Sequence, residues 1–428
     1  MLTMCANLRC ILIHCAVKTT LKEHCPLVQK IPTPHLGKKI PAMKYLLKPA
    51  IAFFLFTSLL GFTDNTYPGP VSSKSKPAAV KIQAAILLDV SNSMDGLIEQ
   101  AKAQLWNMVT VMGKAKCAND VQPQIEIALY EYGRSTNNVK AGYVKKINGF
   151  INNLDSLSQN LFSLTTMGGD EYCGQVIYTS MNELGWDNNT NSYKVIFIAG
   201  NEDFLQGDLH YTKACEEAKK KGVIVNTIYC GDRLSGIKEH WNLGAECGNG
   251  SFSNINQDAK IEDIATPYDS LLYSYNEKLN ATYIAYGRSG SYYFANQAVQ
   301  DKNNSQMSKT AGIKRIKAKG NAAVYNNAQW DMVDLLAADG DGALDKIDKK
   351  ELPDSLKNKT TKELKAIVVQ KSAERSNIQQ EITNLNKQRD IYIAAERVKS
   401  TGNNAATLET EVEKIIREQA KRFNMRIE

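Results

Sequence analysis

The chain has 428 residues, of which 23% are charged, and a formal net charge of +7. The excess positive charge lies within residues 1–48, and the rest of the chain carries equal numbers of basic and acidic side chains. Nucleic-acid binding needs a basic face, so the composition gives no electrostatic support for a nucleic-acid partner.

Residues 1–42 differ from the rest of the chain, with scattered Cys and His that lack a metal-ligand spacing. Met43 begins a better-formed start, in which two lysines precede an apolar run from Ala50 to Phe62. This pattern is typical of a secretory signal, and the run is short for a membrane span. We expect an exported protein of the periplasm or cell envelope, with three leading segments: 1–42 upstream sequence read by mistake, 43–63 signal peptide or membrane anchor, and 64–79 linker.

The stretch from Ala84 to Leu88 is continuously apolar and runs directly into Asp89. Such a run predicts a strand buried on both faces, as in a parallel α/β sheet, where ligands bind at the carboxyl ends of strands. Asp89, Ser91 and Ser93 alternate at that end, so their oxygens can converge on a hard cation: Mg²⁺, or alternatively Mn²⁺ or Ca²⁺. The alternative is that a polar side chain here only caps the following helix.

Strand-like and helix-like runs alternate from Ile82 to about Tyr275, which predicts a doubly wound, mostly parallel α/β sheet in one domain. After the first strand we expect strands at residues 124–132, 143–150, 194–199, 223–230 and 251–255. Helices between these strands are expected at residues 97–116, 153–161, 175–184 and 210–221. A further helix at 261–275 follows the last strand.

Three polar loops occur in this pattern: Asp89-x-Ser91-x-Ser93 after the first strand, a second loop at 163–174 before the helix expected at 175–184, and a third at 199–203 at the end of the fourth strand. In these motifs the chain resembles the von Willebrand factor A (vWA) domain with a metal-ion-dependent adhesion site (MIDAS), over about residues 80–280. The resemblance implies a Rossmann-like fold. It also implies a divalent cation held by the first loop, by a Thr or an acid of the second, and by an Asp of the third.

The second loop departs from the common family pattern. It keeps the family's glycine pair, but Asp170 and Glu171 stand where many members have Thr. Glu171 is the first choice for a metal ligand, and Thr165, Thr166 and Asp170 are the alternatives. An acid here should tighten divalent binding while weakening the pull of the metal on an incoming carboxylate.

The third loop departs further, because Ala-Gly-Asn-Glu-Asp replaces the usual Thr-Asp-Gly. Asn201 or Glu202 could reach the metal directly or through water; the alternative is a polar turn without a metal role. The combination of residues 168–174, 198–203 and 214–231 resembles an exported bacterial branch of the family, in which the domain precedes a helical tail. Five cysteines follow the linker, an odd number, so at least one thiol stays unpaired or links two chains.

Residues 281–428 are expected to form a mainly helical C-terminal region. A charged, helix-favouring segment from Thr361 to Lys399 carries a 4-3 apolar spacing, which predicts a short coiled coil or a helical hairpin. A final helix is expected from Leu408 to Phe423. Its apolar stripe can pack within the chain or support self-association.

The function expected from these features is a non-catalytic interaction module for adhesion or assembly. Its cation keeps a vacant position for a carboxylate of an unidentified partner protein. One alternative is an envelope scaffold with an idle metal site that makes its contacts through the helical tail. A metal-dependent phosphoester hydrolase is less favoured, because Ser91 stands where such an enzyme would have a second Asp and no phosphate-binding glycine motif occurs.

Overall fold

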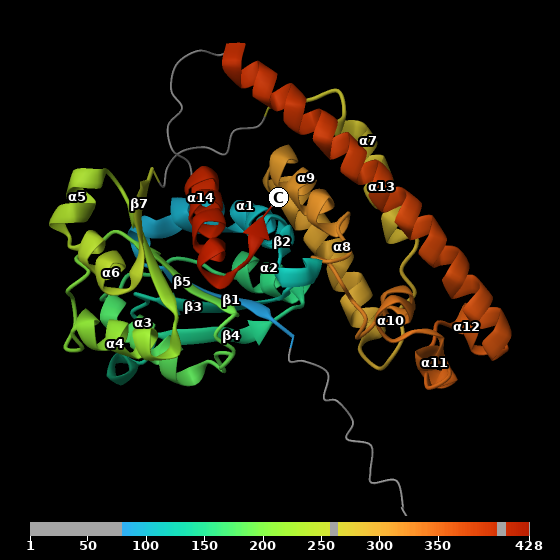
Figure 1. Cartoon of the computed structure of the whole chain (residues 1–428), viewed down its shortest axis with the longest axis horizontal. Coiled ribbons are helices and arrows are strands. Elements are labelled where there is room, and N and C mark those ends of the chain that lie inside the picture. Colours follow the sequence, from blue (N-terminus) through green and yellow to red (C-terminus); the bar gives the residue numbers. More distant parts are fainter. Residues whose placement is uncertain (1–78, 257–263, 400–407, 428) are drawn as a thin grey trace, which may run out of the picture. The chain divides into compact units, whose positions relative to one another are not determined.

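The computed structural model describes residues 79–256, 264–399 and 408–427 (Figure 1). The expected upstream segment and signal lie outside these ranges, as does the expected linker apart from Ala79. No helix within the described ranges is long and apolar enough to cross a membrane.

Six strands form one sheet in the order β4-β3-β1-β5-β6-β7, in which only β4 runs antiparallel to its neighbour. The strands are β1 (Lys81–Asp89), β3 (Gln124–Tyr132), β4 (Lys145–Ile151), β5 (Tyr193–Gly200), β6 (Ile224–Cys230) and β7 (Asn249–Ile255). The predicted fold class is confirmed. Because the strand order reverses between β1 and β5, the carboxyl ends of these two strands flank the crevice where such sheets bind ligands.

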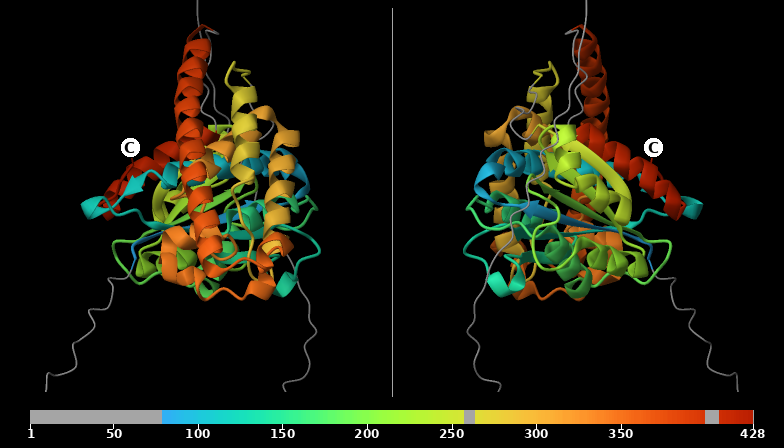
Figure 2. Two further views of the ribbon diagram at one scale, coloured as in Figure 1. Left: turned by 90° about the vertical axis from the view of Figure 1, so that its right-hand side faces the viewer. Right: turned by 90° about the vertical axis from the view of Figure 1, so that its left-hand side faces the viewer.

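Helices cover both faces of the sheet (Figures 1 and 2). Alternate residues of β1 show why: Ile82, Ile86 and Leu88 pack in one buried cluster, whereas Ala85 and Leu87 pack in another. The first cluster includes α1 (Asp95–Met112) and α2 (Leu154–Phe162). The second includes α3 (Cys173–Glu183), α4 (Tyr211–Lys221) and α6 (Trp241–Cys247), and α5 (Arg233–Lys238) precedes α6.

The chain after β7 is helical, as predicted. It contains α7 (Asp269–Asn280), α8 (Gly290–Met307), α9 (Lys309–Lys319), α10 (Met332–Asp339), α11 (Asp341–Leu344), α12 (Asp354–Lys357) and α13 (Thr361–Lys399). α13 packs on α7 and α9 through its apolar stripe, in which Ile378, Ile382 and Leu385 are buried. The stripe is therefore covered within the chain.

The C-terminal segment returns to the sheet. α14 (Leu408–Ala420) packs against α1 and β7, and β8 (Arg426–Ile427) pairs with β2 (Ala115–Lys116), which follows α1. Gln419 of α14 is buried, and its Nε2 donates to Asn226 Oδ1 at 2.6 Å. The Tyr193 hydroxyl donates to Gln419 Oε1 at 2.9 Å. Both partners lie in strands, so a helix from the chain end completes the cover of the sheet.

Some helices differ from the prediction. Of the helix expected at 261–275, residues 261–263 lie outside the described residues, and α7 begins at Asp269, which accepts hydrogen bonds from the backbone N–H and the hydroxyl of Thr266 and so fixes the turn before the helix. Between β6 and β7 two short helices, α5 and α6, were not predicted; Asp232 caps α5. In the C-terminal region, α10 begins at Met332 with Asp331 as its N-cap.

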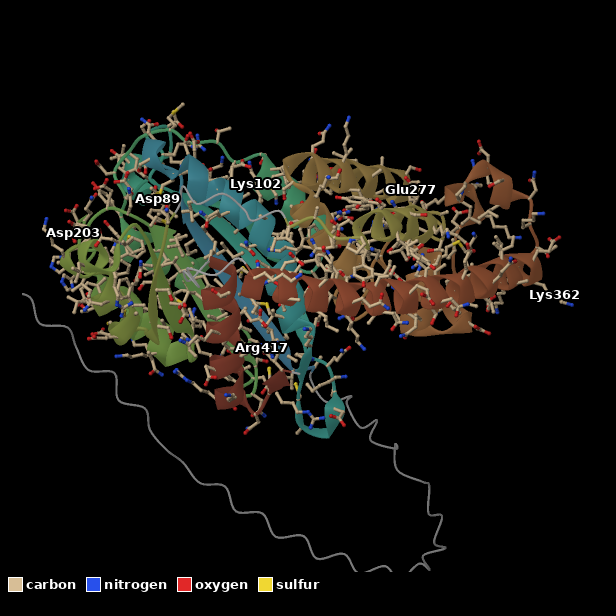
Figure 3. The ribbon with its side chains drawn as sticks, turned by 90° about the horizontal axis from the view of Figure 1, so that it is seen from above. Asp89, Lys102, Asp203, Glu277, Lys362 and Arg417 are labelled. Atoms are coloured by element: carbon tan, nitrogen blue, oxygen red, sulfur yellow. The ribbon has the colours of Figure 1, made fainter. Side chains whose placement is uncertain are left out.

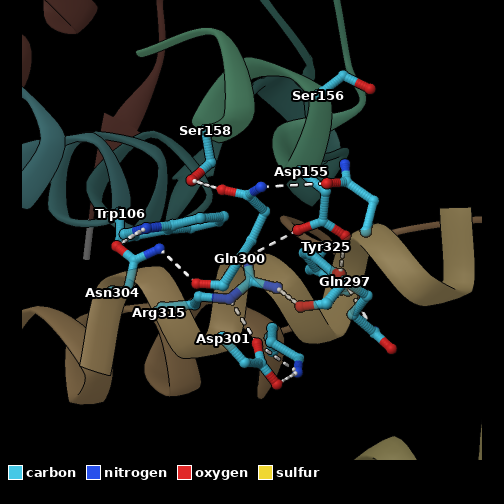
Figure 4. A network of polar contacts seen from close by, with 12 residues as sticks. Trp106, Asp155, Ser156, Ser158, Gln297, Gln300, Asp301, Asn304, Arg315 and Tyr325 are labelled. Carbon is cyan, nitrogen blue, oxygen red and sulfur yellow. Dashed lines mark hydrogen bonds and ion pairs between the residues drawn. The ribbon is translucent and has the colours of Figure 1, made fainter. Parts of the chain in front are cut away.

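A buried polar network joins the sheet helices to the helices after β7 (Figure 4). Arg315 of α9 pairs with Asp155 of α2 at 2.7 Å and also with Asp301 of α8. Trp106 of α1 donates its indole N–H to Asn304 at 2.8 Å. Buried polar groups are costly unless they are paired, so these contacts fix which surfaces of the two helical layers meet.

Candidate metal site

Asp89 is the last residue of β1 and is fully buried. Its Oδ1 accepts the backbone N–H of Ser91 at 2.8 Å, whereas its Oδ2 is buried with no hydrogen-bond partner among the described residues. Burial, and secondarily the charge of Glu202, raises the pKa of Asp89 from 3.8 to about 6. A buried carboxylate oxygen without a donor is costly, and it is rare in folded proteins.

Glu171 of the second loop lies beside Asp89. It is 8% exposed, and burial, followed by the charges of Asp89 and Glu202, raises its pKa from 4.5 to about 8. Gly133 lies between the two acids: a Cβ placed on it would be 2.8 Å from Asp89 Oδ1 and 3.0 Å from Glu171 Cγ. Two buried carboxylates therefore flank one glycine, and their negative charges repel.

Hydroxyl and amide groups of the first and third loops complete the cluster. Ser91 is buried, and its Oγ lies 3.4 Å from Ser93 Oγ. The Ser91 side chain is near enough to Glu171 to oppose part of the rise in the pKa of this acid. Asn201, directly after β5, donates from Nδ2 to Ser93 Oγ at 3.2 Å. Glu202 is exposed, and its charge acts on both buried acids. These six residues therefore meet at the crevice predicted by the strand order.

The other three candidate ligands, all in the second loop, lie outside this cluster. Thr166 donates its hydroxyl to Asp95 Oδ1 at 2.6 Å. Asp170 is exposed and accepts the Tyr172 hydroxyl at 3.3 Å. Thr165 is also exposed. Of the second-loop residues proposed from the sequence, Glu171 is the one that lies with Asp89.

Backbone contacts hold the second loop against the first. Met167 N–H donates to Val90 O, and Gly168 N–H donates to Asn92 Oδ1, each at 2.8 Å. Ser135 N–H, just beyond β3, donates to Gly168 O at 2.8 Å. The second loop is thus fixed by the ends of β1 and β3, which explains why Glu171 is presented to Asp89.

The third loop is held by the segment before α6. Trp241 donates its indole N–H to Glu202 O at 2.8 Å, and Phe204 N–H donates to Glu239 O at 3.0 Å. Asp203 accepts from the His240 ring at 2.9 Å. Asp89 and Asp203 lie at the same end of the sheet (Figure 3).

Two glycines at the site were not singled out from the sequence. Gly133 has φ +79°, and a Cβ on Gly200 would lie 3.0 Å from Asp89 Oδ2 and 2.6 Å from the Tyr132 hydroxyl. Each follows or ends a strand beside β1, so a glycine at the carboxyl end of a predicted strand was the available signal.

The donor set fits a divalent cation that prefers oxygen. Within the described ranges no three His, Cys, Asp or Glu residues are arranged to hold a metal, so a cation here needs the serine hydroxyls as well as Asp89 and Glu171. Carboxylate and hydroxyl oxygens suit Mg²⁺, Mn²⁺ or Ca²⁺. A cation would also compensate the unpartnered oxygen and the repulsion between the acids.

Gly133→Ala should destabilise the protein by about 1–3 kcal/mol, because a left-handed backbone is strained for alanine and the new Cβ contacts both acids. Chemical denaturation measures the change. Gly149→Ala is the matched control, since a Cβ on Gly149 would meet no atom within 4 Å and its φ is not positive. Equal stability of the two variants would contradict the packing described for Gly133.

The fold and the loops define a doubly wound α/β domain with an oxygen-rich cluster at its switch point. No family model and no curated protein matches the sequence. Three similar solved structures are the mussel byssus proximal thread matrix protein 1 with zinc in its MIDAS motif (15% identity, 41% of this chain and 42% of that one, TM-score 0.30), the VWA domain of SpRpn10 (14%, 41% and 88%, 0.31) and an aerotolerance-related membrane protein of Bacteroides fragilis (15%, 41% and 93%, 0.29).

The solved structures similar to this chain thus include vWA domains, one of them with a metal-occupied MIDAS. This chain spans about two-fifths of the mussel protein (42%). At these identities the similarity concerns the fold alone.

Proposed function

We propose that the protein is a non-catalytic, metal-dependent protein-interaction module of the vWA type with a MIDAS. Asp89, Ser91, Ser93 and Glu171 bind the cation. Asn201 and Glu202 lie on the solvent-facing side of this site. The observation that carries the proposal is the buried, unpartnered Oδ2 of Asp89 next to a second buried carboxylate. Mg²⁺, Mn²⁺ or Ca²⁺ would supply the positive charge that this pair lacks.

The exposed side of the cluster is where a partner would bind. Ser93 and Glu202 are exposed, whereas Asp89, Ser91 and Glu171 are buried. A cation held from the buried side keeps a coordination position toward solvent, where a carboxylate of a partner protein binds it. Glu202 weakens this attraction, because a third acid near the cation lowers the positive charge that the partner meets.

Isothermal calorimetry tests the metal site directly. We expect Mg²⁺, Mn²⁺ or Ca²⁺ to bind, and Asp89→Asn or Ser91→Ala to weaken binding more than about tenfold because each removes an inner oxygen donor. Asp208→Asn is the matched control, since Asp208 is an exposed acid beyond the third loop. No binding of any of the three ions by the wild type, or equal binding by Asp89→Asn, would refute the site.

Partner capture tests the interaction itself. The immobilised full chain should retain its partner with Mg²⁺ and release it with chelator or with excess acetate, which competes for the open coordination position. Release by chelator but not by acetate would show a metal-dependent contact that is not a carboxylate.

A scaffold that uses its helical tail is the second candidate. α13 leaves apolar side chains in solvent along its length: Val369 is 53%, Ile391 71% and Val398 77% exposed. Capture that survives chelation and is lost when Ile391 and Val398 are replaced by Ser would favour this alternative, whether the captured protein is another one or a second copy of this chain.

Export to the periplasm or cell envelope is part of both proposals and depends on the signal-like segment after Met43. N-terminal sequencing of the native protein tests it.

A further inference from the structure

The thiols of Cys215 and Cys247 lie near each other, where α4 meets α6. Cys215 is fully buried on α4, and its thiol donates to the backbone oxygen of Gly244 at 4.0 Å. Gly244 lies on α6, which ends at Cys247 one turn later. Burial, and after it the neighbouring Cys247 thiol, raises the pKa of Cys215. Two helices from different parts of the chain thus bring two thiols close together: the Cys215 thiol lies against the Gly244 carbonyl, and Cys247 follows three residues later on the same helix.

The packing that holds these helices does not depend on the thiols. The Phe204 ring lies between them, with ring centroids 5.9 Å from Tyr211 of α4 and 5.2 Å from Trp241 of α6. Gly244 permits this approach, because a Cβ there would lie 2.4 Å from the Phe204 ring. The two thiols are therefore held in position by the surrounding core.

The other three cysteines have different surroundings. Cys173 is buried and its thiol contacts the Tyr132 hydroxyl at 3.8 Å. Cys230 ends β6 in the core, where burial raises its pKa. Cys117 is half-buried and directly follows β2, just before a short helical turn at Ala118–Asp120. An odd number of cysteines after the linker is then explained by one pair and three separate thiols.

We propose that Cys215 and Cys247 are a disulfide-forming pair, oxidised by an exchanging disulfide such as oxidised glutathione. Cys247 is half-buried, whereas Cys215 is buried, so the Cys247 thiolate attacks oxidised glutathione first. This step forms a mixed disulfide on Cys247 and releases one glutathione thiolate. The Cys215 thiolate then attacks the Cys247 sulfur and releases the second. Two thiol protons pass to the two released thiolates, the protein loses two electrons and the reagent gains them.

The cross-link acts on the third loop of the candidate metal site. α6 begins at Trp241, which holds the Glu202 backbone, and α4 begins at Tyr211, which packs on Phe204. Joining the two helices should therefore restrict the segment that carries Asn201 and Glu202. It also closes a chain loop in the unfolded state, which stabilises the folded protein.

The test uses the full chain, purified with reductant and then incubated with oxidised glutathione. Peptide mass spectrometry without reduction should find the Cys215 peptide linked to the Cys247 peptide, and the melting temperature should rise by about 5 °C. Cys215→Ser and Cys247→Ser should each lose both effects. Cys117→Ser, which removes a half-buried thiol elsewhere, should keep both.

Three results would overturn the proposal: a different cysteine pairing, a stable glutathione adduct on Cys247, or both thiols remaining free. Cys247→Ser keeps the test valid if Cys215→Ser fails to fold, since Cys247 lies at the partly exposed end of α6. The outcome is independent of metal binding, which calorimetry on the reduced protein measures separately.

Discussion

Arg315→Met should lower the free energy of unfolding by about 3–5 kcal/mol, because removing one partner of a buried ion pair leaves an uncompensated charge. Arg315 is 1% exposed and donates to Asp155 Oδ1 at 2.7 Å and to Gln297 O at 3.0 Å. Its guanidinium carbon also lies 4.6 Å from the centre of the Trp106 ring. The substitution therefore leaves the buried Asp155 carboxylate without its guanidinium partner. It also removes the group that joins α9 to α1 and α2.

Asp301 responds differently from Asp155. Burial opposes its ionisation, but the charges of Lys319 and Arg315 more than offset burial and hold its pKa well below the usual value. Lys319 stays 2.8 Å from Asp301 when Arg315 is replaced. Most of the loss should therefore come from Asp155, and the double variant Arg315→Met with Asp155→Asn should recover part of the stability.

Lys317→Met is the matched control on the same helix. Lys317 pairs with Asp390 at 2.7 Å, but both side chains reach solvent, so its loss should cost no more than about 1 kcal/mol. Urea denaturation followed by circular dichroism compares the three variants. An Arg315→Met protein within about 1 kcal/mol of wild type would show that the network does not hold the two helical layers together.

Strands and helices that are determined by a short stretch of chain could be predicted from the pattern of apolar and polar residues in the sequence. The apolar run before Asp89 predicted β1, and the charged segment from Thr361 to Lys399 predicted helical structure. A single long helix, α13, stands where a short coiled coil or a helical hairpin was expected. The alternation of Asp89, Ser91 and Ser93 placed three candidate ligands at or just after the carboxyl end of β1. In each case a short stretch of chain determines the feature.

Long-range features could not be predicted in this way. Gln419 binds Asn226 from 193 positions away, and neither residue differs from an ordinary surface amide in the sequence. Arg315 lies in a lysine-rich helix that looks solvated, yet its partners on α2 and α8 bury it. The pairing of Cys215 with Cys247 depends on how α4 meets α6. Such contacts are set by packing between elements, which periodicity does not encode.

The metal-free protein should lose stability as the pH rises from about 4 to about 8. The pKa is raised from 3.8 to about 6 for Asp89 and from 4.5 to about 8 for Glu171. Between the ordinary and the raised value, the folded chain retains a proton that the unfolded chain has released, so stability falls with rising pH. At about 1.4 kcal/mol per pKa unit, the two shifts correspond to roughly 3 and 5 kcal/mol when both acids are ionised.

A bound divalent cation should reverse this dependence, because it favours the ionised form of both acids and stabilises only the folded chain. We therefore expect Mg²⁺ to raise the melting temperature more at pH 8 than at pH 5. The double variant Asp89→Asn with Glu171→Gln removes both titrating groups, so subtracting its pH profile from that of the wild type cancels the other ionisable side chains. Identical profiles for the two metal-free proteins would show that the pKa values of these acids are not raised. An equal effect of Mg²⁺ at both pH values would show that the acids do not bind the ion.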